Sequence, residues 1–291
     1  MFSGVYTALI TPFKNGAVDF DALGRLIDNQ YKAGIDGIVP CGTTGESPTL
    51  SHEEHEEIID FCFKHAKGKM KVLAGTGSNS TAEAIRFTQF VKKIGCDGAL
   101  MVAPYYNKPT QKGLYLHFKK VADTVNIPIV LYNIAGRASV NIMPATIAKL
   151  YSECKNIVGV KEASGSLSQM SAIKALVPDI ELLSGDDALT LPVLSIGGAG
   201  IISVLSNIFP SGTLSLVNAF ERGDIGEAKK MHYKLLPLVN ALFSETNPIP
   251  VKTAASMLGI CGPEIRLPMC EMDEPNRLRL EKVLKDFNLL K

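Results

Sequence analysis

Eight short apolar runs alternate with stretches of helical periodicity, and this alternation constrains the fold more than any other feature of the chain. The runs lie at residues 5–10, 37–40, 71–74, 98–102, 129–132, 157–161, 181–184 and 200–203. Between them, apolar residues recur every three or four positions, as over residues 19–33, 51–66, 81–94 and 112–125. Most of the runs are apolar on both faces, which is typical of a parallel sheet covered by helices.

Eight such units predict a (β/α)8 TIM barrel over residues 1–222, since this fold needs ~250 residues or somewhat fewer. A doubly wound open sheet is the alternative, although no G-x-G-x-x-G motif follows the first run. After Arg222 the strand signals stop, and residues 225–245, 250–258 and 275–288 have helical patterns. We therefore expect a small all-helical C-terminal domain over residues 223–291.

Composition excludes several classes of function. With 46% hydrophobic residues and a net charge of +1, the chain is expected to be a soluble globular protein without affinity for nucleic acid or anionic membranes. No apolar stretch reaches the ~20 residues of a membrane span, and the first residues do not resemble a secretory signal. Six scattered cysteines form no zinc or redox motif. These features together indicate a cytoplasmic protein that acts on small molecules.

A lysine, Lys161, ends the sixth apolar run. An apolar setting favours the uncharged form of a lysine amine, which can then attack a carbonyl and form a Schiff base. The alternative is a lysine whose ammonium group reaches solvent at the end of a strand.

Other polar residues follow the ends of neighbouring runs, where barrel enzymes place their reactive groups. Threonine and tyrosine hydroxyls can pass protons without carrying charge into an apolar barrel, and glycines let backbone N–H groups approach an anion. Taken singly, these residues could belong to ordinary turns or strand rims. Their joint occurrence at matching positions favours a Schiff-base site that includes Thr43, Thr44, Tyr106, Tyr132 and Gly185.

Five motifs match, in order and spacing, the dihydrodipicolinate synthases within the class I pyruvate-dependent aldolase and N-acetylneuraminate lyase family. The resemblance runs from end to end of the chain. The motifs are Gly42-Thr43-Thr44-Gly45-Glu46, Pro104-Tyr105-Tyr106-Asn107-Lys108-Pro109, Tyr132-Asn133, Gly159-Val160-Lys161-Glu162-Ala163-Ser164-Gly165 and Asn247-Pro248-Ile249-Pro250-Val251-Lys252.

The resemblance implies a lyase of diaminopimelate and lysine biosynthesis that uses neither cofactor nor metal. Its substrates would be pyruvate, held as a Schiff base on Lys161, and L-aspartate 4-semialdehyde, and its product 4-hydroxy-tetrahydrodipicolinate. Tyr132 would donate and accept protons, and Thr43 would link it to Tyr106 of a neighbouring subunit. The family usually forms homotetramers, as dimers of dimers. Pyruvate would contact Thr44, the backbone of Ile202 and Gly185.

Arg137 bears on the choice between relatives, because a guanidinium group can hold the carboxylate of a second substrate with two parallel hydrogen bonds. The resemblance assigns it to the semialdehyde, whereas aldolases of the same family that cleave sialic acid or keto-sugar acids are not expected to carry it. Such an aldolase is the main alternative function, and a surface arginine is the structural alternative. The chain departs from the family pattern around this residue at Ala135, Ala138 and Ser139.

A second group of residues matches the positions that bind the feedback inhibitor in lysine-inhibited members of the family. The resemblance therefore implies inhibition by L-lysine. A polar helix start exposed to solvent would explain the same residues, and two histidines spaced i, i+3 make a poor metal site. The group comprises Ser47, His52, His55, Asn79, Glu83 and Tyr105.

A barrel that binds a keto acid or lysine as a sensor, without turnover, is a further alternative. The presence of a lysine with tyrosine and threonine hydroxyls argues against it, because a binding site alone needs no proton relay.

Overall fold

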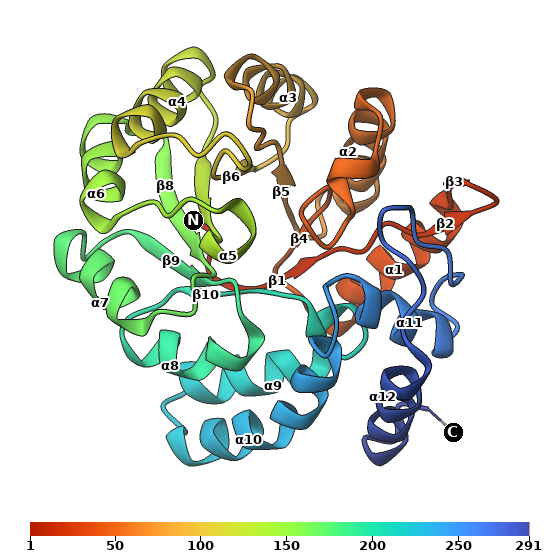
Figure 1. Ribbon diagram of the computed structural model, residues 1–291. Helices are drawn as coiled ribbons and strands as arrows, with labels where there is room; N and C mark the ends of the chain where they lie inside the picture. The colour runs from red at the N-terminus through yellow and green to blue at the C-terminus, as the bar shows by residue number, and fades with distance from the viewer. Residues whose placement is uncertain (291) are drawn as a thin grey trace.

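The computed structural model describes residues 1–290 and contains a closed barrel of eight parallel strands (Figure 1). The strands follow the order β1-β10-β9-β8-β7-β6-β5-β4 around the barrel, and β1 pairs with β4 to close it. Their bounds are Gly4–Ala8 for β1, Gly37–Val39 for β4, Lys71–Gly75 for β5, Gly98–Val102 for β6, Ile129–Asn133 for β7, Ile157–Glu162 for β8, Glu181–Ser184 for β9 and Gly200–Ser203 for β10. The predicted TIM barrel is confirmed.

Every predicted apolar run forms a strand, and the differences lie at the strand ends. The first run was predicted to continue to residue 10, but β1 ends at Ala8. Leu9 still donates a backbone hydrogen bond to Val39, whereas Ile10 donates instead to the side-chain oxygen of Asn207. Apolar character therefore persists past the end of the strand, because these two residues remain buried against the helices.

Helices surround the barrel between successive strands (Figure 1). The first two helices have side-chain N-caps: Asp19 accepts a hydrogen bond from the backbone of Ala22, and Ser51 with Glu54 forms a capping box. The helix bounds are Phe20–Ala33 for α1, His52–Ala66 for α2, Thr81–Ile94 for α3, Gln111–Thr124 for α4, Ala135–Ala138 for α5, Pro144–Glu153 for α6, Leu167–Leu176 for α7, Thr190–Ser195 for α8 and Pro210–Glu221 for α9. Three 3-10 turns lie at Ser47–Thr49, Asp187–Leu189 and Leu205–Asn207.

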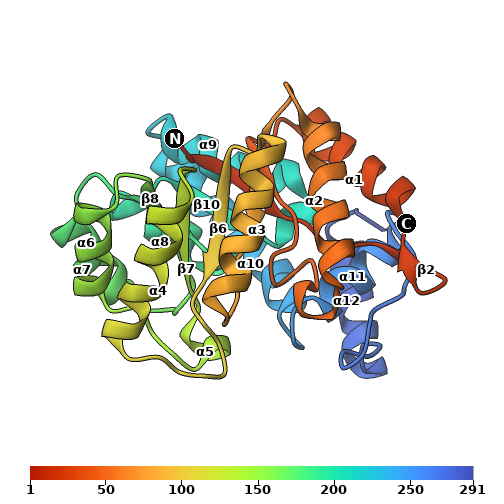
Figure 2. The ribbon, with the colours of Figure 1, turned by 90° about the horizontal axis from the view of Figure 1, so that it is seen from above.

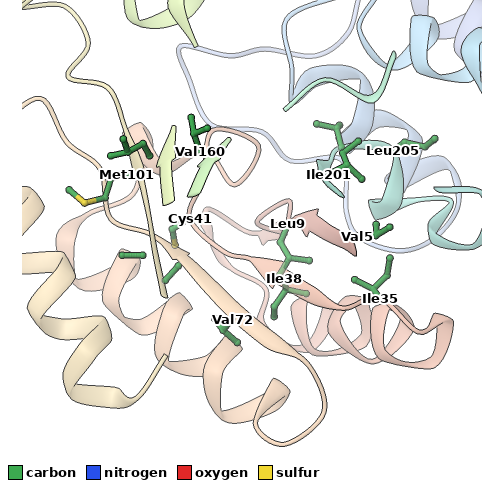
Figure 3. Packing of buried hydrophobic residues seen from close by; sticks show 14 of the residues in the cluster. Val5, Leu9, Ile35, Ile38, Cys41, Val72, Met101, Val160, Ile201 and Leu205 are labelled. Atoms are coloured by element: carbon green, nitrogen blue, oxygen red, sulfur yellow. The ribbon is translucent and has the colours of Figure 1, made fainter. Parts of the chain in front are cut away.

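Alternate residues of each strand face opposite sides of the barrel wall. One set packs outward against the helices and forms the larger apolar cluster; Figure 3 shows part of it, including Val5, Ile38, Val160 and Ile201. The other set faces inward and forms a separate cluster inside the barrel, comprising Phe2, Tyr6, Ala8, Val39, Leu73, Leu100, Val130, Tyr132, Leu183 and Ile202. An inward-facing residue at the carboxyl end of a strand therefore lies at the mouth of a barrel whose interior is filled with side chains.

Two large aromatic side chains from the start of the chain, Phe2 and Tyr6, belong to the inner cluster and are fully buried. Glycines at the starts of β4 and β6 make room for them. A side-chain carbon at Gly98 would lie only 2.5 Å from the Phe2 ring, and one at Gly37 would overlap the Tyr6 ring. The amino-terminal half of the barrel is thus filled, and the space for chemistry lies at the other end.

Helices α10 (Ile225–Leu242), α11 (Ile249–Met257) and α12 (Glu274–Asp286) follow the barrel and confirm the predicted helical C-terminal segment. Helix α10 packs on α9 and on α12. Helices α10, α11 and α12 lie together on one side of the barrel (Figures 1 and 2). The hairpin of β2 (Phe13–Lys14) and β3 (Ala17–Val18) was not predicted. None of the helices in residues 1–290 is long and apolar enough to cross a membrane.

Candidate active site

Lys161 and Tyr132 lie side by side at the carboxyl ends of β8 and β7, where the two residues are register partners. The Lys161 amine is 4.2 Å from the centre of the Tyr132 ring, and the two residues are only 6% and 4% exposed. Lys161 therefore does not extend to solvent, and that alternative is wrong. The side chain points into the barrel because Val160 on one side of it belongs to the outward-facing cluster.

Gly185 follows β9 and lies directly beside the lysine. A side-chain carbon at this position would be 3.0 Å from Lys161 Cε and 2.6 Å from Ala163 Cβ. Any larger residue would therefore displace the lysine stem. Ile202 on β10, 1% exposed, belongs to the same inner cluster as Tyr132.

The residues that follow the tyrosine and the lysine, Asn133 and Glu162, hold the two strand ends together on the outer side of the barrel wall. The Glu162 carboxylate is fully buried and accepts hydrogen bonds from Asn133 Nδ2 at 2.9 Å, Gln169 Nε2 at 2.8 Å and the Ser164 backbone at 2.7 Å. Sequence analysis did not single out this network. The sequence signal that could have found it is Glu162 itself, an acidic residue that directly follows an apolar run and the candidate nucleophile Lys161.

The loop after β4 is fixed by a buried ion pair. Glu46 has a left-handed backbone conformation, with φ of 56°, and its carboxylate lies 2.5 Å from the Lys252 amine of α11. Both side chains are 2% exposed. Burial lowers the pKa of Lys252, and the Glu46 carboxylate opposes that shift. The second Glu46 oxygen accepts from the Arg266 backbone at 3.0 Å. The carboxyl-terminal helices therefore anchor the loop that carries Thr43 and Thr44.

Asn247 lies between two of the predicted substrate-binding residues. Its side-chain Nδ2 donates to Thr44 Oγ1 at 3.0 Å, and its backbone carbonyl accepts from Arg137 at 2.9 Å. Thr44 and Asn247 are 3% and 6% exposed. Arg137 lies on the short helix α5 and is exposed. Its guanidinium group is held by the hydrogen bond to the Asn247 carbonyl.

A cavity of about 390 Å³ brings Thr43 and Arg137 together with most of the predicted inhibitor residues. Lys161 and Tyr132 are not among the residues that line it. Ala138, one of the departures from the family pattern, is buried in its wall. Of the six predicted inhibitor residues, Ser47, His52, His55, Glu83 and Tyr105 line the cavity, whereas Asn79 does not.

Two of the predicted inhibitor residues, His52 and Glu83, are joined by a hydrogen bond, and His52 remains exposed on the helix face. Glu83 accepts from Ser78 and lies 2.5 Å from His52 Nε2, and the Ser78 hydrogen bond lowers the pKa of Glu83. His55 stacks on Phe87 with 4.2 Å between ring centres, and burial lowers its pKa. The Asn79 backbone carbonyl accepts from Asn107 nearby.

Tyr106, the remaining predicted catalytic residue, lies on the surface of the molecule. It is 88% exposed and has a left-handed backbone conformation, with φ of 72°. Within residues 1–290, the hydroxyls of Thr43, Tyr106 and Tyr132 form no hydrogen bonds with one another. The single chain therefore presents Tyr106 outward.

A TIM barrel with a buried lysine and tyrosine paired at its strand ends has the architecture of a Schiff-base-forming lyase of the class I aldolase type. Residues 1–287 match the model of the dihydrodipicolinate synthetase family. The chain belongs to this family.

Close relatives cover the whole chain. A protein of Endomicrobium trichonymphae named 4-hydroxy-tetrahydrodipicolinate synthase is 75% identical over 291 residues, which is all of both chains. The crystal structure of dihydrodipicolinate synthase from Aquifex aeolicus is 52% identical, covers 99% of each chain and has a TM-score of 0.98. The enzyme from Cyanidioschyzon merolae, solved with lysine bound, is 41% identical, covers 99% of each chain and has a TM-score of 0.96.

Replacing Lys252 by methionine should lower the free energy of unfolding by about 3 kcal/mol, because it leaves the Glu46 carboxylate buried without its cation. Thermal unfolding followed by calorimetry measures the loss. The exposed pair Lys230 and Glu227 is the control, and Lys230→Met should change the free energy by no more than about 0.5 kcal/mol. Equal, small effects for both substitutions would contradict the anchoring role of the buried pair.

Proposed function

We propose that the protein condenses pyruvate with L-aspartate 4-semialdehyde to give 4-hydroxy-tetrahydrodipicolinate, with Lys161 as the Schiff-base residue. The observation that carries the proposal is the buried Lys161 amine, 4.2 Å from the Tyr132 ring at the open end of the barrel. The names of the relatives agree with this activity.

In the proposed reaction, the Lys161 amine attacks the keto carbon of pyruvate, and the resulting carbinolamine loses water to give an iminium ion. Loss of a methyl proton then gives an enamine, whose carbon bonds to the aldehyde carbon of the semialdehyde. The amino group of the adduct attacks the iminium carbon, which closes the ring and releases the lysine. Tyr132 is proposed to donate and accept the protons, since it adjoins the amine.

Pyruvate is proposed to lie against Thr44, Gly185 and the backbone of Ile202. Gly185 adjoins the Lys161 stem, and Ile202 belongs to the same inner cluster as Tyr132. The lack of a side chain at Gly185 supports this placement, because it leaves room beside the lysine stem. Arg137 is proposed to bind the semialdehyde carboxylate. Its position in the cavity wall beside Thr43 supports this role over that of a simple surface arginine.

Thr43 is proposed to connect Tyr132 with Tyr106 of a neighbouring subunit, in a homotetramer built as a dimer of dimers. The outward presentation of Tyr106 in the protomer supports a role in another subunit's site. We also propose that residues 1–222 form the catalytic barrel and residues 223–291 a helical domain, and that the protein works in the cytoplasm.

The cavity lined by Ser47, His52, His55, Glu83 and Tyr105 is proposed to bind L-lysine as a feedback inhibitor, and Asn79 is proposed to contribute to the same site. The Glu83 carboxylate, whose pKa is lowered by the Ser78 hydroxyl, offers a charged partner for an ammonium group. The lysine complex of the Cyanidioschyzon merolae enzyme supports the proposal. Because Arg137 and Thr43 line the same cavity, a bound inhibitor would lie close to the second-substrate site.

Borohydride reduction in the presence of pyruvate should add mass irreversibly to Lys161 and to no other lysine, as peptide mass spectrometry would show. Arg137→Ala should retain this labelling but lose roughly 10- to 100-fold in turnover of the semialdehyde, because a charge-assisted carboxylate contact is removed. Cleavage of sialic acid or a keto-sugar acid, without semialdehyde turnover, would favour the alternative aldolase. Pyruvate binding without any product would favour the sensor.

Mixing two inactive variants tests whether Tyr106 acts across an interface. Lys161→Ala and Tyr106→Phe subunits, unfolded and refolded together in equal amounts, should recover about a quarter of wild-type activity. Random pairing makes about half of the dimers mixed, and one of the two sites in each mixed dimer has both Lys161 and Tyr106. Each variant refolded alone is the control. If the mixture stays as inactive as its parts, Tyr106 does not act in a neighbouring subunit.

Glu83→Gln should raise the L-lysine concentration for half-maximal inhibition about tenfold or more, because it removes the proposed partner of the ammonium group. Inhibition of semialdehyde turnover gives the measurement. Glu57→Gln, which makes the same charge change at an exposed position of α2, should leave inhibition as in the wild type. Unaltered inhibition in Glu83→Gln would place the inhibitor elsewhere.

A further inference from the structure

Asn247 is the point where the carboxyl-terminal helical segment reaches the proposed pyruvate site. It lies just before α11 in the chain, yet it contacts Thr44 of the loop after β4 and Arg137 of α5. Both contacts are to residues proposed to bind a substrate carboxylate. The asparagine itself is 6% exposed.

The direction of the hydrogen bond to Thr44 has a chemical consequence. An amide nitrogen can only donate, so Thr44 Oγ1 is the acceptor in the 3.0 Å bond from Asn247 Nδ2. The hydroxyl of threonine also has one hydrogen to donate. Among residues 1–290, no group accepts that hydrogen, so the hydroxyl remains available as a donor to an acceptor in the site.

The side-chain amides of Asn207 and Asn247 are both buried, but only that of Asn207 hydrogen-bonds to the backbone. Asn207 is 2% exposed and makes three hydrogen bonds to the backbone: it donates to Ala8 and Val204 and accepts from Ile10. The Asn247 side chain makes one hydrogen bond, to Thr44, and its buried Oδ1 has no partner within residues 1–290. Leaving a buried acceptor without a donor costs stability. The side chain is therefore placed for Thr44 rather than for the fold.

We infer that Asn247 is a positioning residue that fixes the Thr44 hydroxyl as a hydrogen-bond donor to the carboxylate of pyruvate. The inference rests on the proposed function. Without the asparagine, the hydroxyl is free to rotate and to donate to other acceptors. Pyruvate then binds more weakly before the Schiff base forms, whereas the reactivity of the Lys161 amine is affected little.

The test measures the pyruvate concentration that gives half-maximal borohydride labelling of Lys161. Asn247→Ala should raise it roughly tenfold, as expected for loss of one hydrogen bond to a charged group. Thr44→Val should raise it by a similar factor. The double variant should be no worse than Thr44→Val alone, because both substitutions remove the same contact. Maximal labelling at saturating pyruvate should persist in all three.

Asn247→Asp provides a second, independent test if the alanine variant folds poorly. Its carboxylate can only accept, so the Thr44 hydroxyl would donate to it and turn away from the substrate, and the added charge would repel pyruvate. Half-saturation should therefore rise further than in Asn247→Ala. Asn207→Ala is the matched control: it removes a buried amide and should lower the unfolding temperature, with half-saturation within about twofold of wild type.

Wild-type half-saturation in Asn247→Ala or Asn247→Asp would overturn the inference. So would effects of Asn247→Ala and Thr44→Val that multiply in the double variant, because these would indicate a structural role without coupling. If the wild-type protein takes up no label from pyruvate, the proposed function itself is wrong, and the inference falls with it.

Discussion

Burial of one lysine amine inside the barrel is the constraint on which the rest of the site depends. Lys161 carries an amine among inward-facing apolar side chains, where burying an ionisable group costs stability. The fold accommodates it by alternation along β8, which directs Val160 to the helices and Lys161 inward. Gly185 then leaves the space that the side chain needs.

The carboxyl-terminal segment contacts the loop after β4 directly. Lys252 fixes the loop after β4 through its ion pair with Glu46, and Asn247 contacts Thr44 two residues earlier in the same loop. The residues proposed to bind substrate are therefore held from two directions, by the barrel strands and by α11. This double support accounts for a strained, left-handed Glu46 within a buried loop.

The barrel could be predicted from the sequence because its signals are local. Each strand is a short apolar run, and the start of α2 carries a capping box within four residues. Lys161 drew attention in the sequence because it ends one of these apolar runs, and the structure shows that its side chain is buried. The contacts of Thr44 with Asn247 and of Glu46 with Lys252 join residues 203 and 206 positions apart, so no local pattern contains them. The β2–β3 hairpin has strands of two residues, which are too short to show periodicity.

The most direct test of the central claim is a crystal structure of the protein soaked with pyruvate. The account predicts continuous electron density from Lys161 Nζ to the keto carbon of pyruvate, with the carboxylate at the Thr44 hydroxyl and Tyr132 adjacent. Pyruvate bound without a bond to Lys161, or a Lys161 side chain directed to solvent, would contradict it.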